Sequence, residues 1–135
     1  MTAGTYIIEG GMNISGTLNA TSGVTIYMYS GQLNLNGGSN LNITAPSSGG
    51  LAGIAFWQAS SDTNEINLDQ PMDITGAIYA PTALLQMNST SSVTGCFLVD
   101  VGQLTTDSSS SLNLGVNCSS IGGSPFGGGA AALVE

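Results

Sequence analysis

The chain has 135 residues, of which 41% are hydrophobic, and it carries eight acidic residues but no Lys, Arg or His. This length suits a single domain with a core. Without cationic side chains the chain lacks the groups that neutralise phosphates and anionic lipid surfaces. Without His it has no imidazole base and no His-ligated zinc site. The composition therefore argues against nucleic acid as a partner and against most hydrolase mechanisms.

Three short apolar segments follow one another near the N-terminus: TYIIEG from residue 5, MNI at 12–14 and LNA at 18–20. All three recur in the same order, separated by Gly, Ser, Asn and Pro, which are typical of turns. The first segment returns at residues 24, 52, 76 and 96, the second at 33, 66, 85 and 104, and the third at 41, 72, 93 and 112. The chain is therefore a repeat of roughly 20 residues with three short strands in each unit.

This repeat predicts an all-β fold, a right-handed parallel β-helix of about five coils in which each coil hydrogen-bonds to its neighbours. The expected coils cover about residues 5–23, 24–51, 52–76, 77–95 and 96–118, within a β-helix domain of residues 1–121. No run of about 18 apolar residues occurs, so we expect no direct membrane insertion by this chain.

The second segment alternates large aliphatic residues with amides, as in Leu33-Asn34-Leu35. If the aliphatic side chains point into the coil, the residues between them must point outward. The matching outward positions predict a ladder of side chains, with stacked amides that can hydrogen-bond along it: Asn13, Asn34, Asn67, Gln86 and Thr105. Asn42 belongs to a second outward ladder. A ligand-binding role for such ladders is the alternative to this structural one.

An insertion at about 45–64 interrupts the third coil and carries the single Trp of the chain. Loops that leave a solenoid often carry function. Phe56 and Trp57 are therefore candidate contacts for a carbohydrate or another surface ligand. The alternative is that the two rings only complete a strand, one inward and one outward.

Four carboxylates lie close together in the sequence around this insertion: Asp62, Glu65, Asp69 and Asp73. Oxygen ligands of this kind can bind Ca²⁺, although the spacing matches no known calcium loop. We therefore keep a calcium site as a hypothesis beside the simpler one of solvated surface charges, and we expect no other metal and no cofactor.

The two cysteines, Cys96 and Cys118, are separated by 22 positions, which is about one coil. They could lie in adjacent coils at a distance that permits a disulfide, and such a bridge would indicate an oxidising compartment. Two unrelated buried thiols are the alternative.

Residues 122–135 form a Gly-rich linker followed by the apolar end AAALVE. This end could cap the solenoid, add an edge strand or contact a neighbouring molecule. The candidate assembly contacts are Ala131, Leu133 and Val134.

Two further functions are common on such scaffolds. Polysaccharide hydrolases with this fold need two carboxylates at a suitable distance, and lyases usually need an Arg or Lys, which this chain does not have. The coils are also too few for a long sugar cleft, so we predict no enzyme. Ice binding usually needs one short side chain repeated without interruption, and the outward rows here mix Asn, Gln, Asp and Thr.

Several segments, in order, resemble the C-terminal region of TadG-like proteins of bacterial Flp (tight adherence) pilus assembly: GTYIIEGGMNISG, GVTIYMYSGQLNLNGGSNLNITAP, AGIAFWQ, GAIYAPTALLQMN, GCFLVD and ALVE. The resemblance covers about residues 4–118 and the last residues. It implies a secreted or envelope-anchored bacterial protein, and the family offers no catalytic residues to transfer.

Together these features predict a non-enzymatic extracellular structural or adhesion module, associated with surface or pilus assembly and able to stack end to end into filaments. Its partners would be copies of itself or envelope and pilus components. The alternative is a β-helix module that binds carbohydrate or another surface ligand, with ice binding less favoured.

Overall fold

A computed structural model describes residues 1–88, 92–94, 97–107 and 111–112 of the chain. These residues form twelve β-strands and no helix, and every pairing between the strands is parallel. The strands are β1 (Gly4–Ile8), β2 (Met12–Ile14), β3 (Thr17–Ala20), β4 (Val24–Met28), β5 (Leu33–Leu35), β6 (Asn40–Thr44), β7 (Ile54–Gln58), β8 (Ile66–Leu68), β9 (Met72–Met87), β10 (Ser92–Thr94), β11 (Phe97–Thr106) and β12 (Ser111–Leu112).

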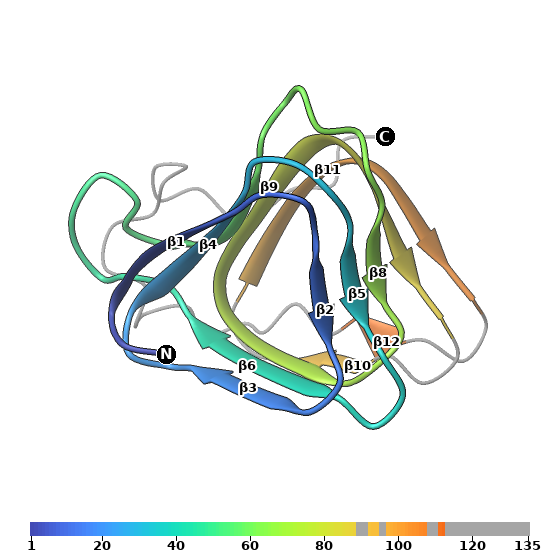
Figure 1. Cartoon of the computed structure of the whole chain (residues 1–135), viewed down its shortest axis with the longest axis horizontal. Helices are drawn as coiled ribbons and strands as arrows, with labels where there is room; N and C mark the ends of the chain where they lie inside the picture. The colour runs from blue at the N-terminus through green and yellow to red at the C-terminus, as the bar shows by residue number, and fades with distance from the viewer. Residues whose placement is uncertain (89–91, 95–96, 108–110, 113–135) are drawn as a thin grey trace.

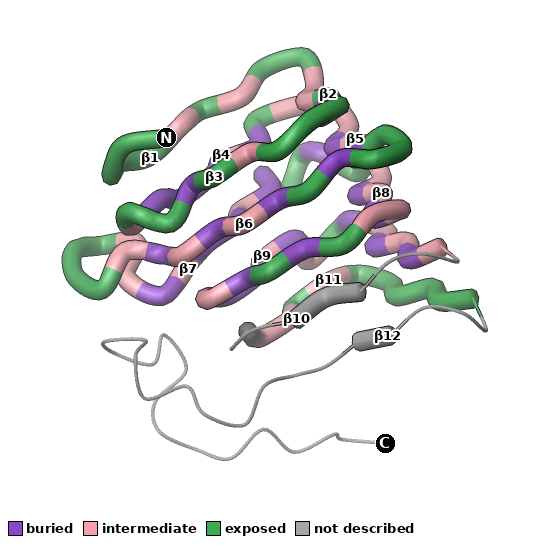
Figure 2. Tube along the Cα trace, turned by 90° about the horizontal axis from the view of Figure 1, so that it is seen from below, coloured by how far each residue is buried: buried purple, intermediate pink, exposed green. Residues whose placement is uncertain are grey.

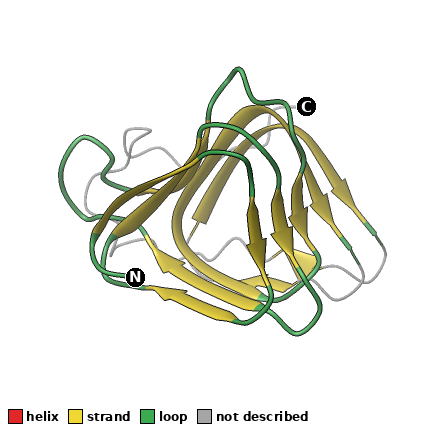
Figure 3. Cartoon of the chain, in the orientation of Figure 1, coloured by secondary structure: helices red, strands yellow, loops and turns green. Residues whose placement is uncertain are grey.

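The strands stack into three faces around one interior (Figures 1 and 3). The first face stacks β1, β4, β7, the middle of β9 and the start of β11. The second face stacks β2, β5, β8 and the ends of β9 and β11. The third face stacks β3, β6, the start of β9, β10 and β12. Each face therefore contains five stacked strand segments. From the first segment of a face to the last, the chain makes about four full turns.

The coil is right-handed. In Figure 1 the chain runs clockwise from β1 through β2 to β3 as it recedes from the viewer. The predicted fold class, a right-handed parallel β-helix, is therefore confirmed.

Two corners of the coil can only be made by glycine. Gly31 has a φ of +95°, and a Cβ added there would lie 2.2 Å from the backbone nitrogen of Gly11 in the preceding coil. Gly76 has a φ of +140° at the point where β9 bends from the third face to the first, and its added Cβ would lie 2.6 Å from the Cβ of Ala45. Larger residues would be both strained and obstructed at these positions.

Buried residues, purple in Figure 2, occur in strands of all three faces, and their aliphatic side chains form one core cluster. The side chains that are almost fully buried include Ile26, Met28, Leu33, Leu41, Ile66, Leu68, Ile74, Leu85 and Met87. This inward set follows from the period of two in each short strand, which places every second residue on the same side.

One buried polar residue compensates for an irregularity in the first face. The register of β7 against β9 shifts between Ile54 and Phe56, so the ladder is locally interrupted. The hydroxyl of Thr25 is fully buried and donates a hydrogen bond of 2.7 Å to the carbonyl oxygen of Ile54. The bulge therefore leaves this carbonyl satisfied.

Several predicted features lie outside the described residues: the Cys96–Cys118 bridge and the tail contacts of Ala131, Leu133 and Val134. They stay predictions. In the part of the chain that is described, no helix is long and apolar enough to cross a bilayer.

Candidate functional site

The predicted outward amide ladder lies on the second face in the predicted register. Asn13 pairs with Asn34, Asn34 with Asn67, Asn67 with Gln86, and Gln86 with Thr105. The side-chain amide of Asn34 donates a hydrogen bond of 3.1 Å to Oδ1 of Asn13. The ladder was therefore correctly placed from the sequence.

The hydrogen bonding along this ladder is not continuous. The amide of Gln86 donates instead to Oδ1 of Asn88, at 3.1 Å, within its own coil. Oδ1 of Asn67 is buried and has no hydrogen-bond partner among the described residues. The corner carboxylate of Asp69 accepts a hydrogen bond from the side-chain amide of Asn88. Polar side chains on this face are thus largely engaged with one another.

A second amide ladder runs along the third face. The amide of Asn42 donates a hydrogen bond of 2.8 Å to Oδ1 of Asn19, and Asp73 continues the column in register with Asn42. Each ladder thus contains a side-chain hydrogen bond between the first coil and the second, and these contacts support the structural interpretation.

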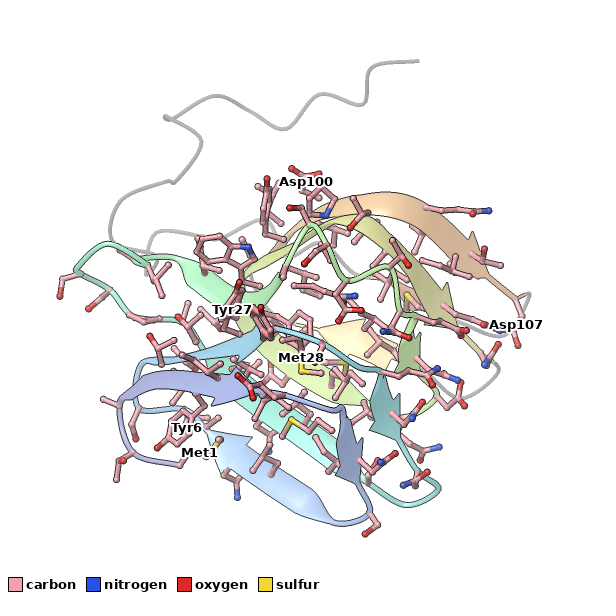
Figure 4. The ribbon with its side chains drawn as sticks, turned by 45° about the horizontal axis from the view of Figure 1, so that its top comes forward. Met1, Tyr6, Tyr27, Met28, Asp100 and Asp107 are labelled. Carbon is pink, nitrogen blue, oxygen red and sulfur yellow. The ribbon has the colours of Figure 1, made fainter. Side chains whose placement is uncertain are left out.

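The first face carries a different outward column, which we call the aromatic column: Ile7, Tyr27, Trp57 and Tyr79, one residue from each of four successive coils. The ring centroids of Tyr27 and Trp57 are 5.3 Å apart, and those of Trp57 and Tyr79 are 6.1 Å apart. Asp100 comes next in register after Tyr79. Figure 4 shows Tyr27 and Asp100 among the side chains of this side of the molecule.

The aromatic column is accessible to solvent. The side chain of Ile7 is 63% exposed, that of Tyr29, whose ring centroid lies 6.5 Å from that of Tyr27, is 53% exposed, and Tyr27, Trp57 and Tyr79 are half-buried. Trp57 was predicted as a ligand contact, and its position permits that role.

Phe56, the other predicted ligand contact, does not belong to this surface. Its side chain is 4% exposed and packs in the core. It pairs with Ile26 and Ile78, which face the interior, because neighbouring residues of a strand point to opposite sides. The prediction for Phe56 is therefore wrong, and one ring points inward while the other covers the outside.

Sequence reasoning missed Tyr27 and Tyr79 as members of the column. Both lie in the apolar opening segments of their coils, at the same outward position as Trp57. Alignment of those segments by register would have identified them.

Two loops leave the solenoid on either side of β7, at residues 45–53 and 59–65. The second is fixed to the body by hydrogen bonds to its backbone. The side-chain amide of Gln58 donates to the carbonyl oxygens of Asp62 and Asn64 at 3.1 and 2.9 Å, and the hydroxyl of Thr82 donates to Ser60 and Asp62 at 3.1 and 3.2 Å. The column thus lies on a face bordered by an anchored loop.

The predicted calcium ligands are not brought together. Asp62 is 4% exposed, and its Oδ1 accepts hydrogen bonds from the backbone and side chain of Asn64 at 3.0 and 2.5 Å. Asp69 lies at a corner beside Asn88, and Asp73 points outward from the third face. Across the described ranges, no three His, Cys, Asp or Glu side chains, Glu65 included, converge to hold a metal ion.

In the part of the chain that the structure describes, the N-terminal end of the solenoid is open. Inward side chains of the first coil are only partly buried, as at Tyr6, Ile8, Met12 and Leu18, and among the described strands β1, β2 and β3 each have a partner on one side only. Figure 2 shows the first coil mostly in exposed and intermediate colours. This end therefore presents unpaired strand edges and part of the core.

A family model described as a domain of unknown function, DUF7305, matches residues 2–114. Neither a curated protein nor a solved structure matches the chain.

Proposed function

The chain belongs to the DUF7305 family of unknown function, and we propose that it is a non-enzymatic structural or adhesion module that assembles end to end. Its setting in this proposal is the bacterial surface or cell envelope, in association with pilus components. The setting rests on the sequence resemblance to TadG-like proteins, and the mode of action rests on the solenoid.

The observation that carries the proposal is the open N-terminal end. Among the described residues, three strand edges there have no second strand beside them, and apart from the Asn19 carbonyl oxygen, which accepts from the terminal ammonium group, they present backbone donors and acceptors that are templates for pairing with another chain. Beside these edges, Tyr6, Ile8, Met12 and Leu18 offer partly exposed apolar surface that a further coil would cover. A contact between unlike ends does not close on itself, so repeated stacking gives a filament.

The test compares the chain with an edge variant and a matched control over a concentration series. In Leu18→Asp, an inward side chain of the first coil becomes charged, whereas Ser47→Asp adds the same charge on an exposed loop. We expect wild type and Ser47→Asp to form larger species in sedimentation velocity and short filaments in electron micrographs. Leu18→Asp should stay monomeric with an unchanged circular dichroism spectrum.

Monodisperse monomers of the wild-type chain at every concentration would contradict assembly. Equal assembly of all three proteins would show that the N-terminal end is not the contact.

The aromatic column favours a second candidate function, a module that binds a surface ligand such as a carbohydrate. Exposed aromatic side chains combine apolar area with polar groups and are common in binding surfaces. A glycan array probed with wild type and Trp57→Ala tests the carbohydrate form of this function. Binding that is absent, or that survives loss of the Trp57 ring, would rule that form out.

A further inference from the structure

We infer that the aromatic column binds an extended segment of a different protein that carries Arg or Lys side chains. This inference rests on the ligand-binding role proposed for the column and names the chemistry of its ligand. It draws on ring geometry, on the placement of two carboxylates and on the charge of the whole chain.

The rings of the column do not form one flat platform. Tyr27 and Trp57 are inclined at 59°, and Trp57 and Tyr79 at 80°. Tyr29 lies beside Tyr27 at 70°. A sugar ring that stacks along the column would need coplanar faces, whereas a cation needs only one ring face within about 6 Å. The inclined rings therefore favour separate cationic groups over a continuous saccharide.

The spacing of the rings suits an extended peptide. Successive centroids are 5.3 and 6.1 Å apart. Side chains on one face of a strand recur about every 6.6 Å, so alternate residues of a segment laid along the column could each reach one ring. Flexible Arg and Lys side chains absorb the small difference.

A carboxylate lies at each end of this surface. Asp100 follows Tyr79 in register, and Glu9 and Tyr29 come directly after the paired residues Ile8 and Met28. Glu9 and Asp100 are both exposed. A basic segment would therefore meet negative charge at both ends and ring faces between them.

The chain itself cannot supply the cations. It has no Lys, Arg or His and a formal net charge of −8. Its terminal ammonium group donates to the carbonyl oxygen of Asn19, in a strand of the third face. A second copy of these 135 residues is excluded as the occupant for the same reason, so the segment must come from a positively charged partner of different sequence.

The experiment titrates the full chain with a seven-residue peptide of alternating Ser and Arg and follows the emission of Trp57, the only Trp. The control peptide carries citrulline, a neutral analogue, in place of each Arg. A neutral cello-oligosaccharide forms the third arm. We expect saturable binding of the Arg peptide, at least about tenfold tighter than the citrulline peptide and weaker at high salt.

Variants are tested by fluorescence anisotropy of the labelled peptide. Trp57→Ala should weaken binding by about tenfold, and Trp57→Phe, which keeps a ring, by less. Asp100→Asn should weaken binding by about threefold. Asp73→Asn removes the same charge from the third face and should leave the affinity nearly unchanged.

Four results would overturn the inference. Equal affinity for the citrulline peptide would remove the role of charge, and equal effects of Asp100→Asn and Asp73→Asn would show only general attraction to an acidic protein. Binding of the oligosaccharide alone would overturn the cationic ligand but keep the proposed ligand-binding function. If no probe changes the Trp57 emission or the anisotropy, both are wrong.

Discussion

The first two coils carry the same pattern of inward residues but differ in burial. Ile8 pairs with Met28, and Leu18 with Leu41. Met28 is 0% exposed and Leu41 is 1% exposed, whereas Ile8 and Leu18 are only partly buried. In a solenoid each coil is covered by its neighbours, so an identical sequence pattern gives a core residue in one coil and a partly exposed one in the terminal coil.

The difference teaches how stability is distributed along the chain. A residue of the second coil has packing partners on both sides, and one of the first coil has partners on one side. Matched substitutions in the two coils therefore measure how much a neighbouring coil adds to the free energy of unfolding.

The largest effect is expected at the corner where the first two coils meet. Gly31→Ala places a Cβ 2.2 Å from the nitrogen of Gly11 at a φ of +95°, so it combines backbone strain with overlap. Together these should destabilise the fold by about 4 kcal/mol. Gly10→Ala has a φ of +88° but no atom within 4 Å of the added Cβ, and should lower stability by only about 1–2 kcal/mol.

Urea unfolding of both variants, followed by circular dichroism, checks this prediction. Equal losses for Gly31→Ala and Gly10→Ala would mean that strain alone, and not the contact between coils, restricts the corner.

The next effect separates the interior coil from the terminal one. Leu41→Ala empties a fully enclosed site and should destabilise the fold by about 3 kcal/mol. Leu18→Ala, its register partner in the first coil, removes a side chain that is already partly exposed, and should lower stability by about 1 kcal/mol.

Thermal denaturation at a concentration where the chain is monomeric compares the two variants. If Leu18→Ala proved as harmful as Leu41→Ala in the monomer, another part of the same chain would have to cover the first coil, and that end would then not be available for assembly.

The opposite end of the chain offers a contrast, because the predicted Cys96–Cys118 bridge would fasten it. A disulfide that closes a loop of this length stabilises by about 3 kcal/mol. Reduction should therefore lower the midpoint of thermal unfolding of wild type, and the Cys96→Ser/Cys118→Ser variant should not respond to reductant. A wild-type midpoint that is insensitive to reductant, with two free thiols by titration, would show that the cysteines are unpaired.

The sequence was sufficient for the fold and for the register of the amide ladder, because both follow from a strict period within strands and a repeat between coils. Asn13, Asn34 and Asn67 share one residue type at one position, so the alignment was visible. The aromatic column uses Ile7, Tyr27, Trp57 and Tyr79 at its position. A column of mixed residue types becomes visible only when the coils are placed side by side.

Two other features were not settled by periodicity. Alternation within a strand offered an inward Phe56 as the alternative to a ligand contact, and only its pairing with Ile26 and Ile78 decides for the inward position. The four carboxylates near the insertion are neighbours in sequence, but Asp62 and Glu65 lie in a loop, Asp69 at a corner and Asp73 on the third face. Closeness along a coiled chain is a poor guide to closeness between side chains.

The smallest effect tests how the amide ladder joins the first coil to the second. Asn34→Ala removes the hydrogen bond to Asn13, and should destabilise the fold by about 1 kcal/mol. Asn67 already has a buried Oδ1 without a partner among the described residues, so Asn67→Ala should change stability by less than about 0.5 kcal/mol.

Hydrogen exchange should show faster exchange of the β1–β3 amides in Asn34→Ala only. Because the first coil has neighbours on one side, the loss of a single coil-to-coil bond should appear there as local opening before it appears as global unfolding. Unchanged exchange in β1–β3 would mean that apolar contacts alone hold the first coil in place.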